Sequence, residues 1–137
     1  MNLHDSERAL APTGDVVELV LPLGHQHTAT ARVVAASLGA DAGLDVDQID
    51  DFRLGVDEAV AIIVDTAGPD SRRVVLQFES SPGAVTLRAA ASPAAPLSRD
   101  DIDALALRII NAVADEFAVA DGAIVVVKRA AAGDGDA

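Results

Sequence analysis

One stretch, residues 45–67, constrains the fold more than any other because it has the pattern of a single long amphipathic helix. Asp45 is placed to cap the first turn, and Gln48 stands three residues later in capping-box position. Gly68 and Pro69 should end the helix, since glycine tolerates a left-handed cap and proline cannot continue it. The apolar side chains recur at three- and four-residue steps, the spacing that forms one helix face; they are Ile49, Phe52, Val56, Val60 and Ile63. This face needs a sheet or another helix to pack on.

Two elements are expected before this helix. Residues 15–21 are short and rich in β-branched side chains, which predicts a strand closed by Pro22. Residues 28–38 then predict a helix with a cap near Thr28 and a stop at Gly39. The apolar row of that helix consists of Ala31, Val34, Ala35 and Leu38.

After the long helix, the period of the apolar residues changes from 3.6 to 2. Residues 74–78 and 84–90 predict two strands joined by a turn over 80–83, where a proline and a glycine suit the fixed and the positive dihedral. Residues 117–120 and 123–129 flank an Asp-Gly pair, which is the strongest short-range signal of a hairpin.

A third helix is expected between the two hairpins. Ser98 is a candidate cap, and the acidic residues that follow it suit the first turn. The expected buried row consists of Ile102, Leu105, Ile109, Val113 and Phe117, with Ala112 between them.

These elements predict an α+β fold, a two-layer sandwich of three helices on a mostly antiparallel, mixed sheet. A chain of 137 residues is long enough for one core and too short for two ordinary domains. We therefore expect a loose N-terminal arm over residues 1–14, a single domain over 15–129 and a flexible tail over 130–137.

Composition excludes several classes of function. Aromatic residues make up only 2%, so there is no platform for stacking bases or sugars. The net charge of -12 repels phosphate backbones and anionic lipid but favours a basic protein surface, although acidity that serves only solubility is an open alternative. We expect neither a nucleic-acid nor a membrane ligand. Without cysteines, a signal-peptide run or an apolar stretch of ~20 residues, the pattern predicts a cytoplasmic protein.

Few side chains offer chemistry by themselves. Asp57 and Glu58 are adjacent on the long helix, where neighbours diverge by about 100°, so they cannot act on one atom as a pair. His25 and His27 fall in a loop, and no third metal ligand is indicated, so no metal site is expected. No serine stands in a nucleophile motif, and there is no P-loop.

Two segments in the expected order carry a resemblance to a known family. Residues 54–58, Leu-Gly-Val-Asp-Glu, lie in the middle of the second helix, and residues 104–116 lie in the third. Together they resemble the anti-sigma factor and serine kinase family of the GHKL (Bergerat-fold) ATPases. That family reads roughly L-A-V-S-E-A-x-x-N in its second helix and G-x-G-L in a later one. The resemblance covers about residues 16–129 and implies the histidine-kinase-like ATPase fold.

The departures from the family pattern all fall on its nucleotide elements. Glu58 matches the family's candidate general base, but the asparagine that would hold Mg²⁺ four residues later is Ile62. Ala91 stands where the adenine-reading aspartate is expected, and neither that carboxylate nor the following glycine turn is present. Ala104 and Ala106 replace the glycines of the G-x-G-L run, where each methyl group occupies the approach of a phosphate.

The resemblance and its departures together imply a binding protein. We expect an anti-sigma factor that sequesters an alternative sigma factor through protein contacts, without ATP, magnesium or kinase activity. Its acidity suits a basic DNA-binding partner. Arg32 matches the place where family members present an arginine to the sigma factor, although an ordinary solvated arginine would look the same. The resemblance also implies that the chain can bind an anti-anti-sigma factor and can form a homodimer.

Two alternatives stay open from the residues alone. In the first, the chain is an active ATP-dependent serine kinase that phosphorylates an anti-anti-sigma factor, with Glu58 as the base and Mg-ATP as the cofactor. In the second, it is a non-catalytic regulatory domain of the same fold whose partner is not a sigma factor.

Overall fold

The computed structural model describes residues 15–131. Its elements are β1 (Asp15–Pro22), α2 (Thr28–Asp41), α3 (Val46–Asp65), β2 (Arg73–Ser81), β3 (Ala84–Ser92), a short 3-10 turn η1 (Arg99–Asp101), α4 (Ala104–Val113), β4 (Glu116–Ala120) and β5 (Ala123–Arg129). The expected arm over 1–14 lies outside the described residues, as does the expected tail beyond residue 131. The domain boundaries therefore stay predictions.

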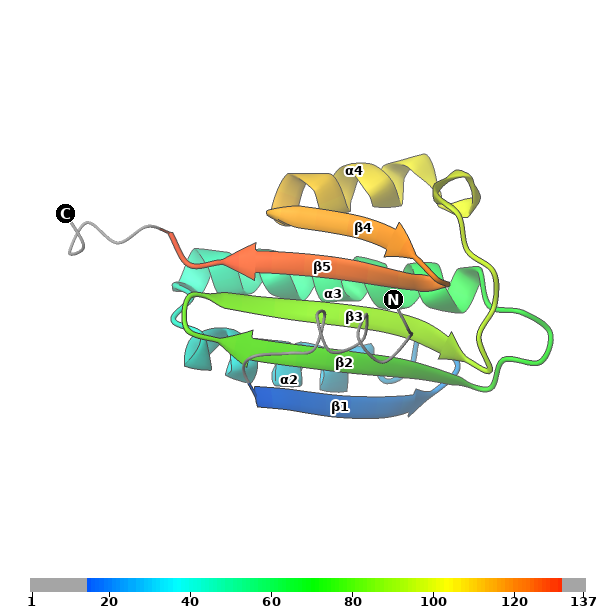
Figure 1. Cartoon of the computed structure of the whole chain (residues 1–137), viewed down its shortest axis with the longest axis horizontal. Coiled ribbons are helices and arrows are strands. Elements are labelled where there is room, and N and C mark those ends of the chain that lie inside the picture. The colour runs from blue at the N-terminus through cyan, green and yellow to red at the C-terminus, as the bar shows by residue number, and fades with distance from the viewer. Residues whose placement is uncertain (1–14, 132–137) are drawn as a thin grey trace, which may run out of the picture.

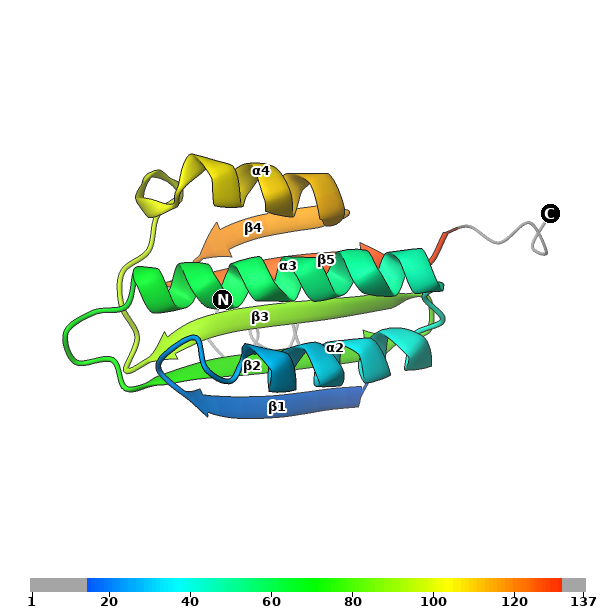
Figure 2. The same cartoon turned by 180° about the vertical axis from the view of Figure 1, so that it is seen from behind.

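The five described strands form one sheet in the order β1-β2-β3-β5-β4. The helices lie on one face of it, with α2 and α3 running along the strand direction and α4 beside β4 (Figures 1 and 2). This arrangement confirms the α+β fold class. The sheet is not mixed, however, because all four strand pairings are antiparallel. Two pairings are hairpins joined by two-residue turns, which permit only antiparallel neighbours.

Helix α3 has the capping box expected from its sequence. The backbone N–H of Gln48 donates to Asp45 Oδ1 at 2.8 Å, and the backbone N–H of Asp45 donates to Gln48 Oε1 at 2.8 Å. The expected apolar face is buried except for Ile49, which is half-buried, and its Phe52 ring meets Phe78 of β2 edge to face with 6.3 Å between centroids. The helix ends slightly earlier than expected, with Thr66 as its C-cap; Gly68 is not among the glycines with positive φ, so it does not provide the expected left-handed cap.

Helix α2 differs from its prediction at both ends. Thr28 is not the cap but the first helical residue; His27 holds the cap position, and the Thr28 hydroxyl donates to the His25 carbonyl at 2.8 Å. The helix also continues past Gly39, which is buried within it. A Cβ built at Gly39 would lie 3.2 Å from Leu44 Cδ1. This glycine therefore permits close packing and does not terminate the helix.

The third helix begins later than predicted. Ser98 caps only the η1 turn, and α4 starts after a second cap, Asp103, whose carboxylate accepts from the Ala106 N–H at 3.3 Å. The predicted buried row is therefore confirmed only in part, because Ile102 and Val113 are buried whereas Leu105 and Ala112 are exposed. Ile102 lies outside the helix and cannot set its face, and Leu105 is 62% exposed. The face that packs inward consists of Ala106, Ile110 and Val113.

Both hairpins are confirmed. Asp121 and Gly122 have φ of 53° and 75°, the pair of positive values that a two-residue primed turn requires. A Cβ at Gly122 would also approach the Ala95 carbonyl oxygen to 2.7 Å, so the loop before η1 passes directly over this turn. The first hairpin is tighter than expected, since its strands run on to Ser81 and from Ala84.

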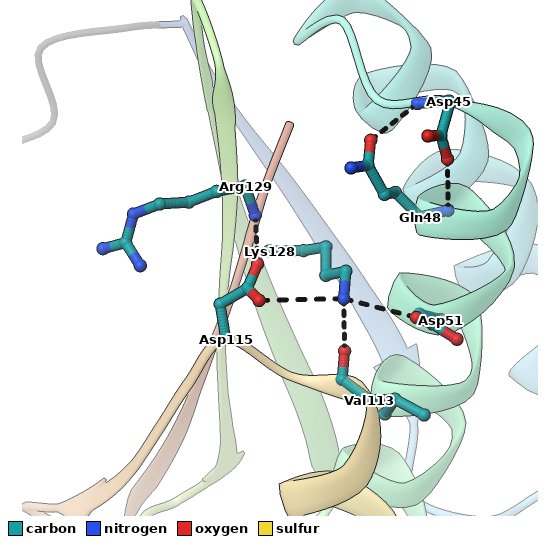
Figure 3. A network of polar contacts seen from close by, with 7 residues as sticks. All are labelled: Asp45, Gln48, Asp51, Val113, Asp115, Lys128 and Arg129. Carbon is teal, nitrogen blue, oxygen red and sulfur yellow. Dashed lines mark hydrogen bonds and ion pairs between the residues drawn. The ribbon is translucent and has the colours of Figure 1, made fainter. Parts of the chain in front are cut away.

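A buried lysine joins the C-terminal part of the fold to α3. Lys128 of β5 donates to the Val113 carbonyl at 2.9 Å, and its Nζ lies 3.3 Å from Asp51 and 3.8 Å from Asp115 (Figure 3). The contacts link α3, the end of α4 and the sheet. Within residues 15–131, no helix is both long and apolar enough to cross a membrane.

Candidate functional site

A cavity of about 330 Å³ opens between α3 and the segment that runs from η1 into α4. Its α3 wall includes Glu58, Ile62 and Asp65, and the opposite wall includes Asp103 and Ala106. The wall from α3 follows from helix geometry, because residues three, four and seven apart share a face. The opposite wall is set by the two successive caps that precede α4.

The cavity brings together three of the site residues expected from sequence. Glu58 and Ile62 lie one turn apart on α3, and Ala106 faces them from α4. Ile62 is 4% exposed and Ala106 is 8% exposed, so both belong to the apolar floor. Glu58 stands at the edge of this floor, half-buried. The position matching the family's magnesium ligand is therefore filled by a packed alkyl side chain.

The two other degenerate positions do not line the cavity. Ala91 is buried near the end of β3, 7% exposed, and Ala104 is exposed as the first residue of α4. The absence of a carboxylate at Ala91 and of glycine at Ala104 therefore changes the surroundings of the cavity and not its lining.

Sequence reasoning missed most of the negative charge around this cavity. Besides Glu58, the lining contains Asp65, Asp101 and Asp103. Burial raises the pKa of Glu58, and the neighbouring charges of Asp57 and then Asp103 raise it further. The seven-residue spacing of Glu58 and Asp65 was a usable signal, because it spans two turns of one face. The approach of Asp101 and Asp103 depends on tertiary structure.

The remaining expected site residue, Arg32, lies on α2 and pairs with α3. Its Nε is 3.5 Å from Asp57 Oδ1, with the two side chains 43% and 28% exposed. That oxygen is buried and has no hydrogen bond of normal geometry, so the contact is an ion pair at the limit of hydrogen-bonding distance. Burial raises the pKa of Asp57, while the charges of Arg32 and Arg53 oppose the shift. Arg32 does not line the cavity.

A family model described as the histidine kinase-like ATPase domain matches residues 21–129, from the end of β1 to the end of β5. The chain belongs to this family. The match confirms the GHKL superfamily and covers both walls of the cavity. No curated protein sequence matches the chain.

The lining of this histidine kinase-like ATPase domain suits a magnesium nucleotide poorly. Ile62 has no oxygen to offer a hard cation, and the surrounding carboxylates repel phosphates. Among residues 15–131, no group of three or more histidine and carboxylate side chains is arranged to hold a metal ion. His25, one of the two loop histidines, instead lies with Nε2 3.3 Å from Asp65 Oδ1.

Proposed function

We propose that the protein is an anti-sigma factor that sequesters an alternative sigma factor through protein contacts, without binding ATP or transferring phosphate. The observation that carries the proposal is the replacement of a nucleotide-binding lining by Ile62, Ala106 and four carboxylates in a histidine kinase-like ATPase domain. The resemblance of residues 54–58 and 104–116 to the anti-sigma family supplies the identity of the partner.

The carboxylates argue against phosphate binding on electrostatic grounds. A nucleoside triphosphate carries several negative charges. In the family, a magnesium ion held by the asparagine binds these phosphates to the protein. In this cavity burial raises the pKa of Glu58 most, and the charges of Asp57 and Asp103 raise it further, so added negative charge is disfavoured here. A site of this kind favours a cationic ligand.

Arg32 supports the partner-binding part of the proposal. Its guanidinium is held near Asp57 by the ion pair, but the side chain as a whole is 43% exposed, so a partner can reach it. The next residue, Val33, is 70% exposed and points about 100° further round the helix, so it adds apolar surface to the adjoining face of α2. Arginine is enriched at protein interfaces, and this part of α2 is open to a partner.

Nucleotide binding is tested by thermal unfolding in a titration with Mg-ATP. A ligand at 100 times its dissociation constant stabilises the folded state by about 2.7 kcal/mol, which a melting curve detects easily. We expect no saturable shift in Tm. Partner binding is tested by co-purification with each sigma factor of the genome that encodes the chain, and binding to none of them rejects the anti-sigma assignment.

A second candidate function is an active serine kinase with Glu58 as the general base. The raised pKa of Glu58 favours it, because a base is most effective with a pKa near the working pH. This candidate predicts transfer of the γ-phosphate of ATP to an anti-anti-sigma factor, and loss of transfer in Glu58→Gln. If the protein neither binds a sigma factor nor transfers phosphate, the remaining function is that of a regulatory domain with a different protein partner.

A further inference from the structure

The cavity between α3 and α4 has an apolar floor. Ile62 and Ala106 are buried at its base, and Ala61 contributes a small side chain beside them. At its mouth Leu105 is 62% exposed. A ligand that reaches the base of the cavity therefore covers apolar surface there.

The rim of the same cavity is acidic. Glu58 of α3 and Asp101 and Asp103 of the opposite segment line it, and its described lining contains no basic residue. Asp101 accepts bonds from the N–H and the hydroxyl of Ser98, at 2.9 Å and 3.1 Å. Its charge, like that of Glu58, is not balanced by a cation within the lining. Asp65 differs, because His25 lies beside it.

We propose that this cavity takes the guanidinium group of an arginine presented by a basic protein partner, with the arginine stem packed along Ile62 and Ala106. Charge complementarity selects the occupant, since an apolar groove with an acidic rim matches a side chain with an apolar stem and a cationic end. The inference rests on the proposed function only in assigning that arginine to a protein partner.

Arginine fits this cavity better than other cations. Its planar group donates to two carboxylates at once and is more weakly hydrated than an ammonium group, so entry into a partly apolar site costs less. The volume of about 330 Å³ is at the lower end of the ~300–1,000 Å³ range of ligand pockets, which suits one long side chain.

The surroundings of Glu58 agree with a cationic occupant. Its pKa is raised first by burial and then by Asp57 and Asp103, so these surroundings disfavour the ionised form. A guanidinium between Glu58 and Asp103 would offset both charges.

The test uses the full chain labelled with ¹⁵N and titrated with N-acetyl-L-arginine amide. We expect saturable chemical-shift changes at the amides of Glu58, Ile62 and Ala106. N-acetyl-L-citrulline amide has nearly the same shape without the charge. We expect its affinity to be lower by a factor of about ten or more, the effect of one lost charge-assisted contact. N-acetyl-L-lysine amide should fall between the two.

Two variants identify the site. The double variant Glu58→Gln with Asp103→Asn preserves side-chain shape, and Asn is as good a cap as Asp, so the fold should persist while arginine binding falls about tenfold or more. The matched control, Asp70→Asn with Asp121→Asn, removes the same charge at exposed positions outside the cavity and should bind as the native protein does. Ala61→Leu, which fills the cavity without changing charge, should also abolish binding.

Several outcomes would overturn the inference: no saturable change at the three amides, equal binding of the citrulline compound, or equal losses in the two double variants. The result is separable from the proposed function. A sigma factor that binds the Glu58→Gln, Asp103→Asn protein with native affinity would reject this docking site and leave the anti-sigma assignment intact. If the protein binds arginine at this cavity but binds no sigma factor, the docking site is supported and the anti-sigma assignment is rejected.

Discussion

Asp51 and Lys128 meet at 3.3 Å although they are 77 positions apart in the sequence. Asp51 lies on α3 and Lys128 on β5, and the lysine is only 9% exposed. Because the same ammonium group donates to the Val113 carbonyl, it satisfies the end of α4 while pairing with α3. The wall of the cavity formed by α4 is thereby fixed to the sheet.

Replacing Lys128 by methionine should lower the free energy of unfolding by about 1–3 kcal/mol, because it leaves the buried Val113 carbonyl without its donor. Urea denaturation measures this change. Asp51→Asn is the control and should cost less than about 1 kcal/mol, since Asp51 is 46% exposed and water replaces the lost contact. Equal stability of Lys128→Met and the native protein would mean that the carbonyl does not depend on this bond.

Arg32→Ala should weaken binding of the sigma partner with little effect on stability. The two side chains are partly exposed but Asp57 Oδ1 is buried, so loss of the pair should cost about 1 kcal/mol of folding free energy. A central interface arginine typically contributes about 2 kcal/mol or more to binding. Titration calorimetry separates the two effects, with Arg53→Ala as a matched control on α3. Equal affinities of Arg32→Ala and Arg53→Ala would remove Arg32 from the interface.

Glu58→Gln should stabilise the protein at neutral pH. The folded state raises the pKa of Glu58 above its ordinary value of 4.5, so ionisation of this carboxyl destabilises the fold as pH rises through the raised pKa. The advantage of the glutamine variant should therefore be largest at neutral pH and disappear below pH 4.5. Thermal melts across this range, with Asp70→Asn as the control, measure the difference. An advantage that persists at low pH would need another cause.

Ile62→Asn should not restore ATP binding. The substitution returns an amide to the place of the family's magnesium ligand, but the residues at Ala91, Ala104 and Ala106 are unchanged. Ile62 is 4% exposed, so the polar replacement should also destabilise the fold by about 2–5 kcal/mol, against about 0.5–1.5 kcal/mol for Ile62→Val. Melts with and without Mg-ATP test both points, and saturable stabilisation of the asparagine variant would show that one residue controls nucleotide binding.

The sequence was sufficient where the signals are local. The cap of α3 by Asp45 and Gln48 and the turn at Asp121 and Gly122 depend on neighbours in the chain, and both are present as predicted. The predicted start of the third helix was wrong because two local cap signals compete there. Ser98 and Asp103 are both good caps within a few residues, and propensity alone does not decide that the first governs only η1.

The candidate site could be predicted only on its α3 side. Glu58 and Ile62 share a face by helical spacing, so their proximity follows from one element. The approach of Asp101 and Asp103 requires the loop after β3 to carry η1 across to α3, which no periodic pattern encodes. The pairing of Arg32 with Asp57 likewise depends on how α2 packs against α3.

Binding of the sigma partner in the presence and absence of Mg-ATP tests the central claim most directly. By thermodynamic linkage, a nucleotide that does not bind the protein cannot change the affinity for the partner. We therefore predict that one sigma factor binds with the same dissociation constant in both conditions. A dissociation constant that changes with Mg-ATP, or the absence of binding to every sigma factor of the genome, would contradict the account.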